Sequence, residues 1–219
     1  MRIGIDTNVY SALTGVLMNN RRGYTMTTRA RAVEATRASI LDAIVELASE
    51  RVFTQIGLDD VAARAGVSVQ TVLRHFGNRD GLIDAGVLHA QKSVVEERRT
   101  PHGDVTQAVR VIVNHYEQRG RSVLLMLAQE PTDARIARIT DEGRAMHRAW
   151  VEEVFAPLLP TEKVQHSAGV DLLVVATDVY TWKLLRLDRG LSRAQAQQRI
   201  ERLVRAVLTD LGETGRTHS

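Results

Sequence analysis

The sequence feature that most constrains the fold is Gly66, which interrupts the stretch VAARAGVSVQTVLRHFGNRDGL (residues 61–82). The residues on both sides of it are typical of helices, and glycine accepts a positive φ without steric strain. Two short helices joined by a turn of three or four residues that contains glycine form a helix-turn-helix unit. The pattern therefore predicts helices over residues 58–65 and 69–76, with Ser68 as the N-cap of the second one.

The second of these helices carries side chains suited to reading DNA. They include hydrogen-bond donors and acceptors, and apolar groups that can contact thymine methyls. A helix of this kind enters the major groove with its N-terminal residues nearest the bases. The candidate contacts from this helix and its cap are Ser68, Val69, Gln70, Thr71, Arg74 and His75.

Positive charge is concentrated just before the helix-turn-helix. Residues 21–40 hold five arginines against one glutamate, a local charge of +4, whereas the whole chain carries +3. Cationic side chains at such a position neutralise DNA phosphates. The candidate phosphate contacts in this arm are Arg29, Arg31 and Arg37.

Residues 37–83, RASILDAIVELASERVFTQIGLDDVAARAGVSVQTVLRHFGNRDGLI, resemble the N-terminal domain of the TetR family of bacterial transcriptional regulators. The spacing matches the family pattern without a gap. The resemblance implies that residues 69–75 form the recognition helix and that Arg79 contacts phosphate at the start of the fourth helix. It also implies a C-terminal helical domain that senses a ligand and forms a dimer.

Two of the expected DNA contacts depart from the family pattern. Gly57 stands where the family often has serine or threonine, so that only backbone N–H groups and the helix dipole remain to bind a phosphate there. Leu73 replaces a tyrosine that commonly contacts DNA, and leucine cannot donate a hydrogen bond to a phosphate. These departures affect individual contacts and leave the fold assignment intact.

The remaining chain favours an all-α fold. It has four prolines in 219 residues, and no strand alternation. We expect about nine helices, the later ones over residues 104–119, 121–129, 132–156, 162–189 and 192–211. We divide the chain into a weakly ordered extension with the basic arm (residues 1–28), a DNA-binding domain (residues 29–83) and a helical effector-binding and dimerisation domain (residues 84–219).

Two groups of residues in the C-terminal domain are candidates for binding partners. Soft or amphipathic side chains on helices that surround a cavity are suited to an effector, and they are Tyr116, Met126, His147, Trp150 and Tyr180. Apolar stripes on the last two predicted helices are suited to a homodimer interface, and they comprise Leu172, Val175, Val179, Trp182, Leu185, Ile200, Leu203, Val204 and Val207.

The functional expectation is a cytoplasmic repressor that binds a near-palindromic double-stranded DNA operator as a dimer. A small-molecule effector would shift the helix that begins at Arg79 and release the DNA. The chain has no cysteine, no run of apolar residues long enough to span a membrane and no metal-ligand spacing, so we expect no cofactor, no metal site and no membrane contact.

Two other functions stay open from the sequence. The opening IGIDTNVYSAL (residues 3–13) resembles the first strand of PIN-domain ribonucleases, in which an aspartate such as Asp6 helps to hold Mg²⁺. A helical protein without DNA binding is the other alternative. We expect no enzyme, because neither a strand pattern nor a catalytic motif follows.

Overall fold

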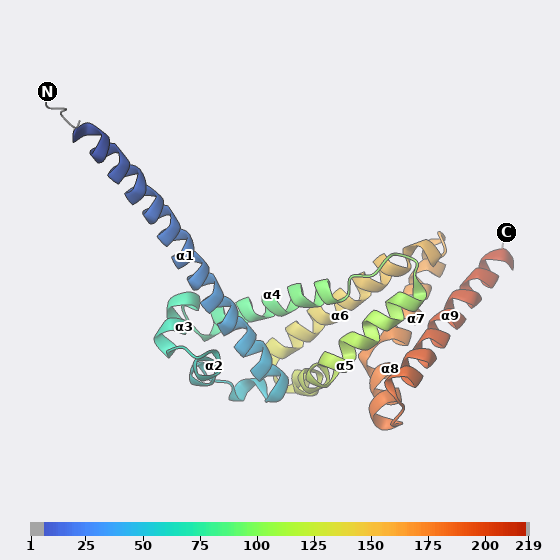
Figure 1. Cartoon of the computed structure of the whole chain (residues 1–219). Coiled ribbons are helices and arrows are strands. Elements are labelled where there is room, and N and C mark those ends of the chain that lie inside the picture. Colours follow the sequence, from blue (N-terminus) through green and yellow to red (C-terminus); the bar gives the residue numbers. More distant parts are fainter. Residues whose placement is uncertain (1–6, 218–219) are drawn as a thin grey trace.

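The computed structural model describes the backbone of residues 7–217 and the side chains of residues 29–213. The described part is all-α, as the sequence predicts, and contains no strand. Short 3₁₀ segments join some of the helices (Figure 1). The helices are α1 (Thr7–Glu50), α2 (Leu58–Ala65), α3 (Val69–Phe76), α4 (Arg79–Glu97), α5 (Val105–Gln129), α6 (Ala134–Phe155), α7 (Lys163–Thr177), α8 (Val179–Lys183) and α9 (Arg193–Thr217).

The helix-turn-helix has the boundaries that the sequence predicts for α2 and α3. Gly66 lies in the left-handed region, at φ 68° and ψ 31°. Its N–H donates to the carbonyl of Ala63, and the N–H of Val67 donates to the carbonyl of Ala62 at 3.0 Å. This pair of bonds is the Schellman arrangement that ends a helix at glycine. The positive φ of Gly66 thus sets the angle at which α3 follows α2.

The N-terminal unit is built around its own apolar core. Ile40, Ile44 and Leu47 of α1 are buried against Val61 of α2 and Val72 of α3. Helix α4 crosses α1 so closely that a Cβ at Gly86 would lie 2.9 Å from the Cγ2 atom of Ile44. Ile136 of α6, in the C-terminal half, is also buried in this core. The helix-turn-helix therefore packs directly on the rest of the chain.

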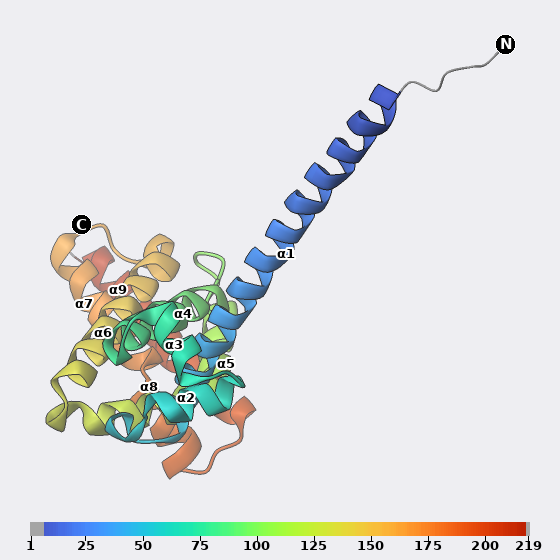
Figure 2. The same ribbon diagram turned by 90° about the vertical axis from the view of Figure 1, so that its left-hand side faces the viewer.

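Helix α1 is longer than we expect from the sequence. The prediction places a weakly ordered extension over residues 1–28, whereas the helix begins at Thr7. Figures 1 and 2 show its N-terminal part projecting away from the other helices. No proline occurs before Pro101, so the local i to i+4 hydrogen bonds can continue upstream without a packed partner. Residues 1–6, which include Asp6, lie outside the described residues.

The helices of the C-terminal half differ from the prediction at two points. We expect a break between residues 119 and 121, but α5 is continuous, and Gly120 in its interior gives room to the ring of Trp182. We expect one helix over residues 162–189, but it breaks at Asp178. The carboxylate of Asp178 accepts the N–H of Tyr180 at 2.8 Å and so caps α8, which ends in a π-helical turn, Leu184–Asp188.

A second apolar core lies among α5, α6, α7, α8 and α9. Its most buried members include Ile112 and Val113 of α5, Phe155 of α6, Leu173 of α7 and Val204 of α9. The described residues thus form two cores. Helix α4 starts in the first core and runs from the helix-turn-helix along α6 (Figure 1). None of the described helices is both long and apolar enough to cross a lipid bilayer.

We expect Gly66→Ala to lower the free energy of unfolding by about 1–2 kcal/mol, because alanine is strained in the left-handed region. The space around the missing Cβ is open, so backbone strain is the whole effect. Gly212→Ala is the matched control, since Gly212 lies in α9 with ordinary helical φ and open space. That change should stabilise the chain by up to about 1 kcal/mol.

Urea unfolding at one fixed protein concentration measures both variants. If the two substitutions shifted the free energy in the same direction, the role of Gly66 as a left-handed joint would be wrong.

Candidate DNA-binding surface and effector cavity

Helix α3 is amphipathic and presents a polar outer face. Val72 is fully buried, while Gln70 and Arg74 are exposed. The hydroxyl of Ser68 accepts the N–H of Thr71 at 3.2 Å, and the two hydroxyl oxygens lie 3.0 Å apart. Ser68 therefore caps α3 as predicted. The half-buried residues of the predicted set on this helix are Val69, Thr71, Leu73 and His75.

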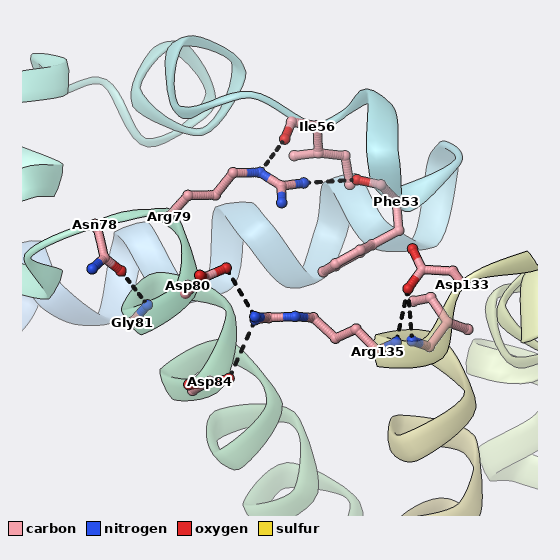
Figure 3. Close-up of polar contacts among 10 residues, drawn as sticks. Phe53, Ile56, Asn78, Arg79, Asp80, Gly81, Asp84, Asp133 and Arg135 are labelled. Carbon is pink, nitrogen blue, oxygen red and sulfur yellow. Dashed lines mark hydrogen bonds and ion pairs between the residues drawn. The ribbon is translucent and has the colours of Figure 1, made fainter.

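The predicted phosphate contacts on α1 and α4 differ in their surroundings. Arg29 and Arg31 are exposed on α1. Arg37 lies over the ring of Phe76, with 4.6 Å between its guanidinium carbon and the ring centroid. Arg79 donates from Nε to the carbonyl of Ile56 at 3.1 Å and from a terminal nitrogen to the carbonyl of Phe53 at 3.2 Å (Figure 3).

These contacts give Arg79 a structural task, because they close the loop between α1 and α2 onto the start of α4. A phosphate contact by Arg79 stays a prediction, and it would share the guanidinium with those two carbonyls. Gly57 also has an internal partner, since its N–H donates to Asp60 at 2.9 Å. This N–H and the Arg51 guanidinium lower the pKa of the Asp60 carboxyl.

The N-terminal unit is tied to the C-terminal half by polar contacts at one end of α6. Arg135 donates to Asp80 at 2.8 Å and to Asp84 at 3.4 Å, both on α4 (Figure 3). The backbone N–H of Phe53 donates to the side chain of Gln129 at 2.8 Å. These contacts join the end of α5 and the start of α6 to the start of α4 and to the loop before α2.

A cavity of about 280 Å³ lies where the two halves of the chain meet. Its wall comes from α1, from α4, from the middle of α5 and α6, and from the start of α8. Four of the five predicted effector residues line it, namely Tyr116, Met126, His147 and Tyr180. Trp150 does not belong to this wall. It is buried, its indole N–H donates to the carbonyl of Arg98 at 3.0 Å, and its ring stacks on His147.

Arg98, which has a buried cationic side chain on this wall, was not predicted from the sequence. It is only 8% exposed. Burial lowers the pKa of its guanidinium, while the ring of Tyr116 lies 5.9 Å away. In the sequence it stands in the polar run EERRT, which is typical of an exposed helix end, so no pattern marks it.

His147 is held neutral at the same end of the cavity. Its Nε2 lies 3.2 Å from the hydroxyl oxygen of Thr177, and that hydroxyl donates to the carbonyl of Leu173 at 2.7 Å. The hydroxyl oxygen must then accept, so Nε2 carries the proton and Nδ1 does not. Burial, helped by the charge of Arg98, lowers the pKa of His147 to about 3.

The predicted dimer residues fall into two groups. Leu172 and Val175 of α7 and Leu203 of α9 are exposed, while Leu185 and Val207 are half-buried. The other four lie in the core of this chain itself, so they cannot also form the surface that meets a partner. This corrects the expectation for Val179, Trp182, Ile200 and Val204. An apolar stripe on a helix has the same period whether it faces its own core or a second copy.

The fold and this surface define a helix-turn-helix regulator that binds DNA. The family model described as "Bacterial regulatory proteins, tetR family" matches residues 40–85, the segment from α1 into α4. Residues 40–85 thus carry the helix-turn-helix of the TetR family of transcriptional regulators.

Two curated regulators are similar to this chain. The HTH-type transcriptional regulator AlkX of Mycobacterium tuberculosis is 40% identical over 67 residues, which cover 29% of this chain and 32% of that protein. The HTH-type transcriptional regulator BetI of Burkholderia mallei is 27% identical over 150 residues, 62% of this chain and 75% of that protein. The match to AlkX thus spans about a third of that regulator.

Solved structures support the same fold over most of the chain. A tetR-family transcriptional regulator from Streptomyces coelicolor aligns with a TM-score of 0.64 at 17% identity, covering 84% of this chain and 88% of that one. A TetR transcriptional regulator from Streptococcus agalactiae aligns with a TM-score of 0.55 at 18% identity, covering 85% and 98%. At these identities the likeness shows the fold alone.

We expect Arg74→Ala to weaken binding to a preferred DNA sequence by about 1–3 kcal/mol and to relax the preference at one base position. Arg74 is exposed on α3 and is free to reach a base edge. Fluorescence anisotropy with a panel of single-base variants of the duplex measures the effect. Arg110→Ala, an exposed arginine on α5, is the control. An unchanged base preference in Arg74→Ala would remove this residue from the base contacts.

We expect acid to destabilise the fold through His147. Its pKa is about 3 in the folded chain and about 6.5 when unfolded, so the unfolded chain binds the extra proton between these values. Stability is therefore lost as the pH falls below about 6.5, by about 1 kcal/mol at pH 5.5 for this residue. Urea unfolding at pH 7.5 and pH 5.5 should show a smaller loss in His147→Gln. Equal losses in both proteins would contradict a neutral buried His147.

Proposed function

We propose that the chain is a homodimeric repressor that binds a near-palindromic operator and is released when a small molecule enters the cavity. The observation that carries this proposal is the composition of the cavity wall. Ile44 and Ala48 of α1, which also belong to the helix-turn-helix unit, share that wall with Val87 of α4, Met126 of α5 and His147 of α6. A molecule in this space contacts both halves of the chain.

The proposed DNA contact places α3 in the major groove. Gln70 and Arg74 are the exposed side chains on this helix for base edges, and Arg29 and Arg31 lie on α1 for phosphates. Two copies related by a two-fold axis read two half-sites about one helical turn apart, so the operator should be a near-palindrome. Since that DNA is chromosomal, we place the protein in the cytoplasm.

Helix α4 is the element that would couple the cavity to DNA. It has 19 residues, so it is about 28 Å long. Its first residue, Arg79, holds the loop before α2, and it ends beside Arg98 in the cavity wall. A ligand that displaces the C-terminal end of α4 therefore also moves the helix-turn-helix.

An effector can release DNA only to the extent that it prefers the state that does not bind DNA. The same coupling requires that the operator lower the affinity for the effector by an equal factor. The coupling is thus measured by two affinities: that for the operator with and without the effector, and that for the effector with and without the operator.

The proposed dimer surface is the exposed apolar face of α7 and α9. Val164, Leu172 and Val175 are spaced along one face of α7 and are exposed, as is Leu203 of α9. Both helices also pack through their other faces into the core of the chain. Burying such apolar side chains against a second copy is favourable, since water is removed from apolar surface.

The proposed function is tested first by selecting the preferred duplex from random DNA with the full chain. A near-palindromic sequence, bound with nanomolar to subnanomolar affinity at moderate salt, is expected. Recovery of no preferred sequence would contradict operator binding.

We expect Val175→Glu to convert the dimer into a monomer, because it places a charge in the apolar surface. Val175 is 65% exposed within one chain, so the fold itself should be unaffected. Operator affinity should then fall by about 10²–10⁴-fold, as two linked half-site contacts become separate ones. Light scattering after size exclusion and anisotropy with the selected duplex measure the two effects.

Leu88→Glu is the matched control, since Leu88 is a 67% exposed leucine on α4, away from α7 and α9. It should stay dimeric. A Val175→Glu protein that remained a dimer would place the interface elsewhere.

A further inference from the structure

Two buried polar atoms in the described side chains have no hydrogen-bond partner, and both belong to the cavity wall. They are Nε of Arg98 and Nδ1 of His147. Buried polar atoms are nearly always paired in folded proteins, so an orphan atom needs a specific explanation. Two orphans at one end of one cavity indicate a polar group that binds there.

Arg98 is the stronger of the two signals. In the described part of the chain, its guanidinium makes neither a hydrogen bond nor an ion pair, although it is 8% exposed. An unpaired buried charge destabilises a fold. An anion bound in the cavity would satisfy this charge.

The other charged groups around the cavity are already paired or capped. Arg119 is bound to Glu97 in a bidentate ion pair, and Arg144 is bound to Glu130 and Asp141. Asp178 is used as the cap of α8, and its carboxylate accepts the N–H of Tyr180. The carboxylate of Glu97 attracts the Arg98 guanidinium electrostatically, but its hydrogen bonds go to Arg119 and His115. Arg98 is therefore the cation on this wall without a hydrogen-bonded carboxylate.

The polar end is small, and the rest of the wall is mostly apolar. His147 and Tyr116 lie beside Arg98, and the hydroxyl of Tyr116 is already used to donate to the carbonyl of Thr177 at 3.1 Å. Away from this end, the wall is formed by residues such as Ile44, Val87 and Met126. A fitting ligand thus has one anionic end and an apolar body.

The volume sets the size of that ligand. A space of about 280 Å³ accommodates about nine groups of the size of a water molecule. An eight-carbon fatty acid is close to this size, and its carboxylate matches the fork of a guanidinium. A cationic ligand of the same size would meet the unpaired charge of Arg98.

We propose that the cavity binds an organic monocarboxylate of about nine or ten non-hydrogen atoms in total, and that Arg98 binds its carboxylate. The apolar body lies along α1, α4 and α5. Nδ1 of His147 accepts a hydrogen bond from a donor group of the ligand where one is present. The identification of this ligand as the effector rests on the proposed function, but its binding does not.

The test uses the full chain without DNA and isothermal titration calorimetry. The probes are octanoate, 1-octanol and octyltrimethylammonium, each below its micelle concentration, so that the apolar chain is constant and the head group varies. Octanoate should bind most tightly and the cation least. Equal or tighter binding of 1-octanol or of the cation would overturn the proposal.

Arg98→Met isolates the head-group contact. It should weaken octanoate binding by about 10- to 100-fold and leave 1-octanol within about threefold, since one charge-assisted interaction is lost. The backbone carbonyl of Arg98 still accepts the indole N–H of Trp150, and removal of an unpaired charge should raise the thermal unfolding midpoint. An unchanged octanoate affinity would overturn the assignment.

Arg98→Lys tests the same carboxylate contact if Arg98→Met fails to fold. It keeps the charge but lacks the guanidinium fork, so octanoate should bind more weakly than to the unchanged chain and still more tightly than 1-octanol. An octanoate affinity no higher than that of 1-octanol in this variant would also contradict the proposal.

Operator binding separates this inference from the proposed function. If octanoate binds through Arg98 but leaves operator affinity unchanged, the carboxylate site is correct and effector release is wrong. If the chain binds its operator but does not bind octanoate, the carboxylate site is wrong and the DNA-binding function stands.

Discussion

The close crossing of α4 over α1 is the contact on which the other features depend. A glycine at position 86 allows it, since any larger residue would collide with Ile44. This crossing seats the helix-turn-helix on the C-terminal half and makes α1 part of the cavity wall. The polar contacts of Arg135 with Asp80 and Asp84 then hold the beginning of α4 against α6 (Figure 3). The proposed DNA-binding surface and the proposed effector site thus share one packed interface.

The cavity has an apolar wall and also contains an unpaired charge, two features that rarely occur together in a folded protein. Its wall is mostly apolar, as in a core, yet Arg98 brings an unpaired charge into it. Removal of this charge would favour stability, so its presence is best explained by a ligand that satisfies it. The unpaired charge of Arg98 lowers the free energy of unfolding, and proteins often retain such destabilising residues at binding sites. The same reasoning applies to Nδ1 of His147, although a neutral acceptor is less costly to bury than a cation.

The sequence predicted the DNA-binding unit well and the C-terminal half only in outline. The boundaries of α2 and α3 depend on Gly66 and Ser68, whose effects on the backbone are local and therefore readable from the chain. The helix break at Asp178 was not predicted. Aspartate occurs both within helices and at their N-caps, and only the extended backbone of Asp178 in the structure shows that it is a cap. The continuity of α5 through Gly120 was missed because the ring of Trp182, far along the chain, fills the space beside it.

By itself, the sequence determined the all-α class, the helix-turn-helix and the exposure of Gln70 and Arg74 on its second helix. These follow from hydrophobic period, caps and turn residues, which act within a few residues of one another. Only the tertiary structure decided which side of each C-terminal stripe is buried, placing Trp182 inside and Val175 outside. It alone also placed Arg98 in a cavity, because burial depends on which distant helices meet. A period along one helix records that a face is apolar, but it does not record what covers that face.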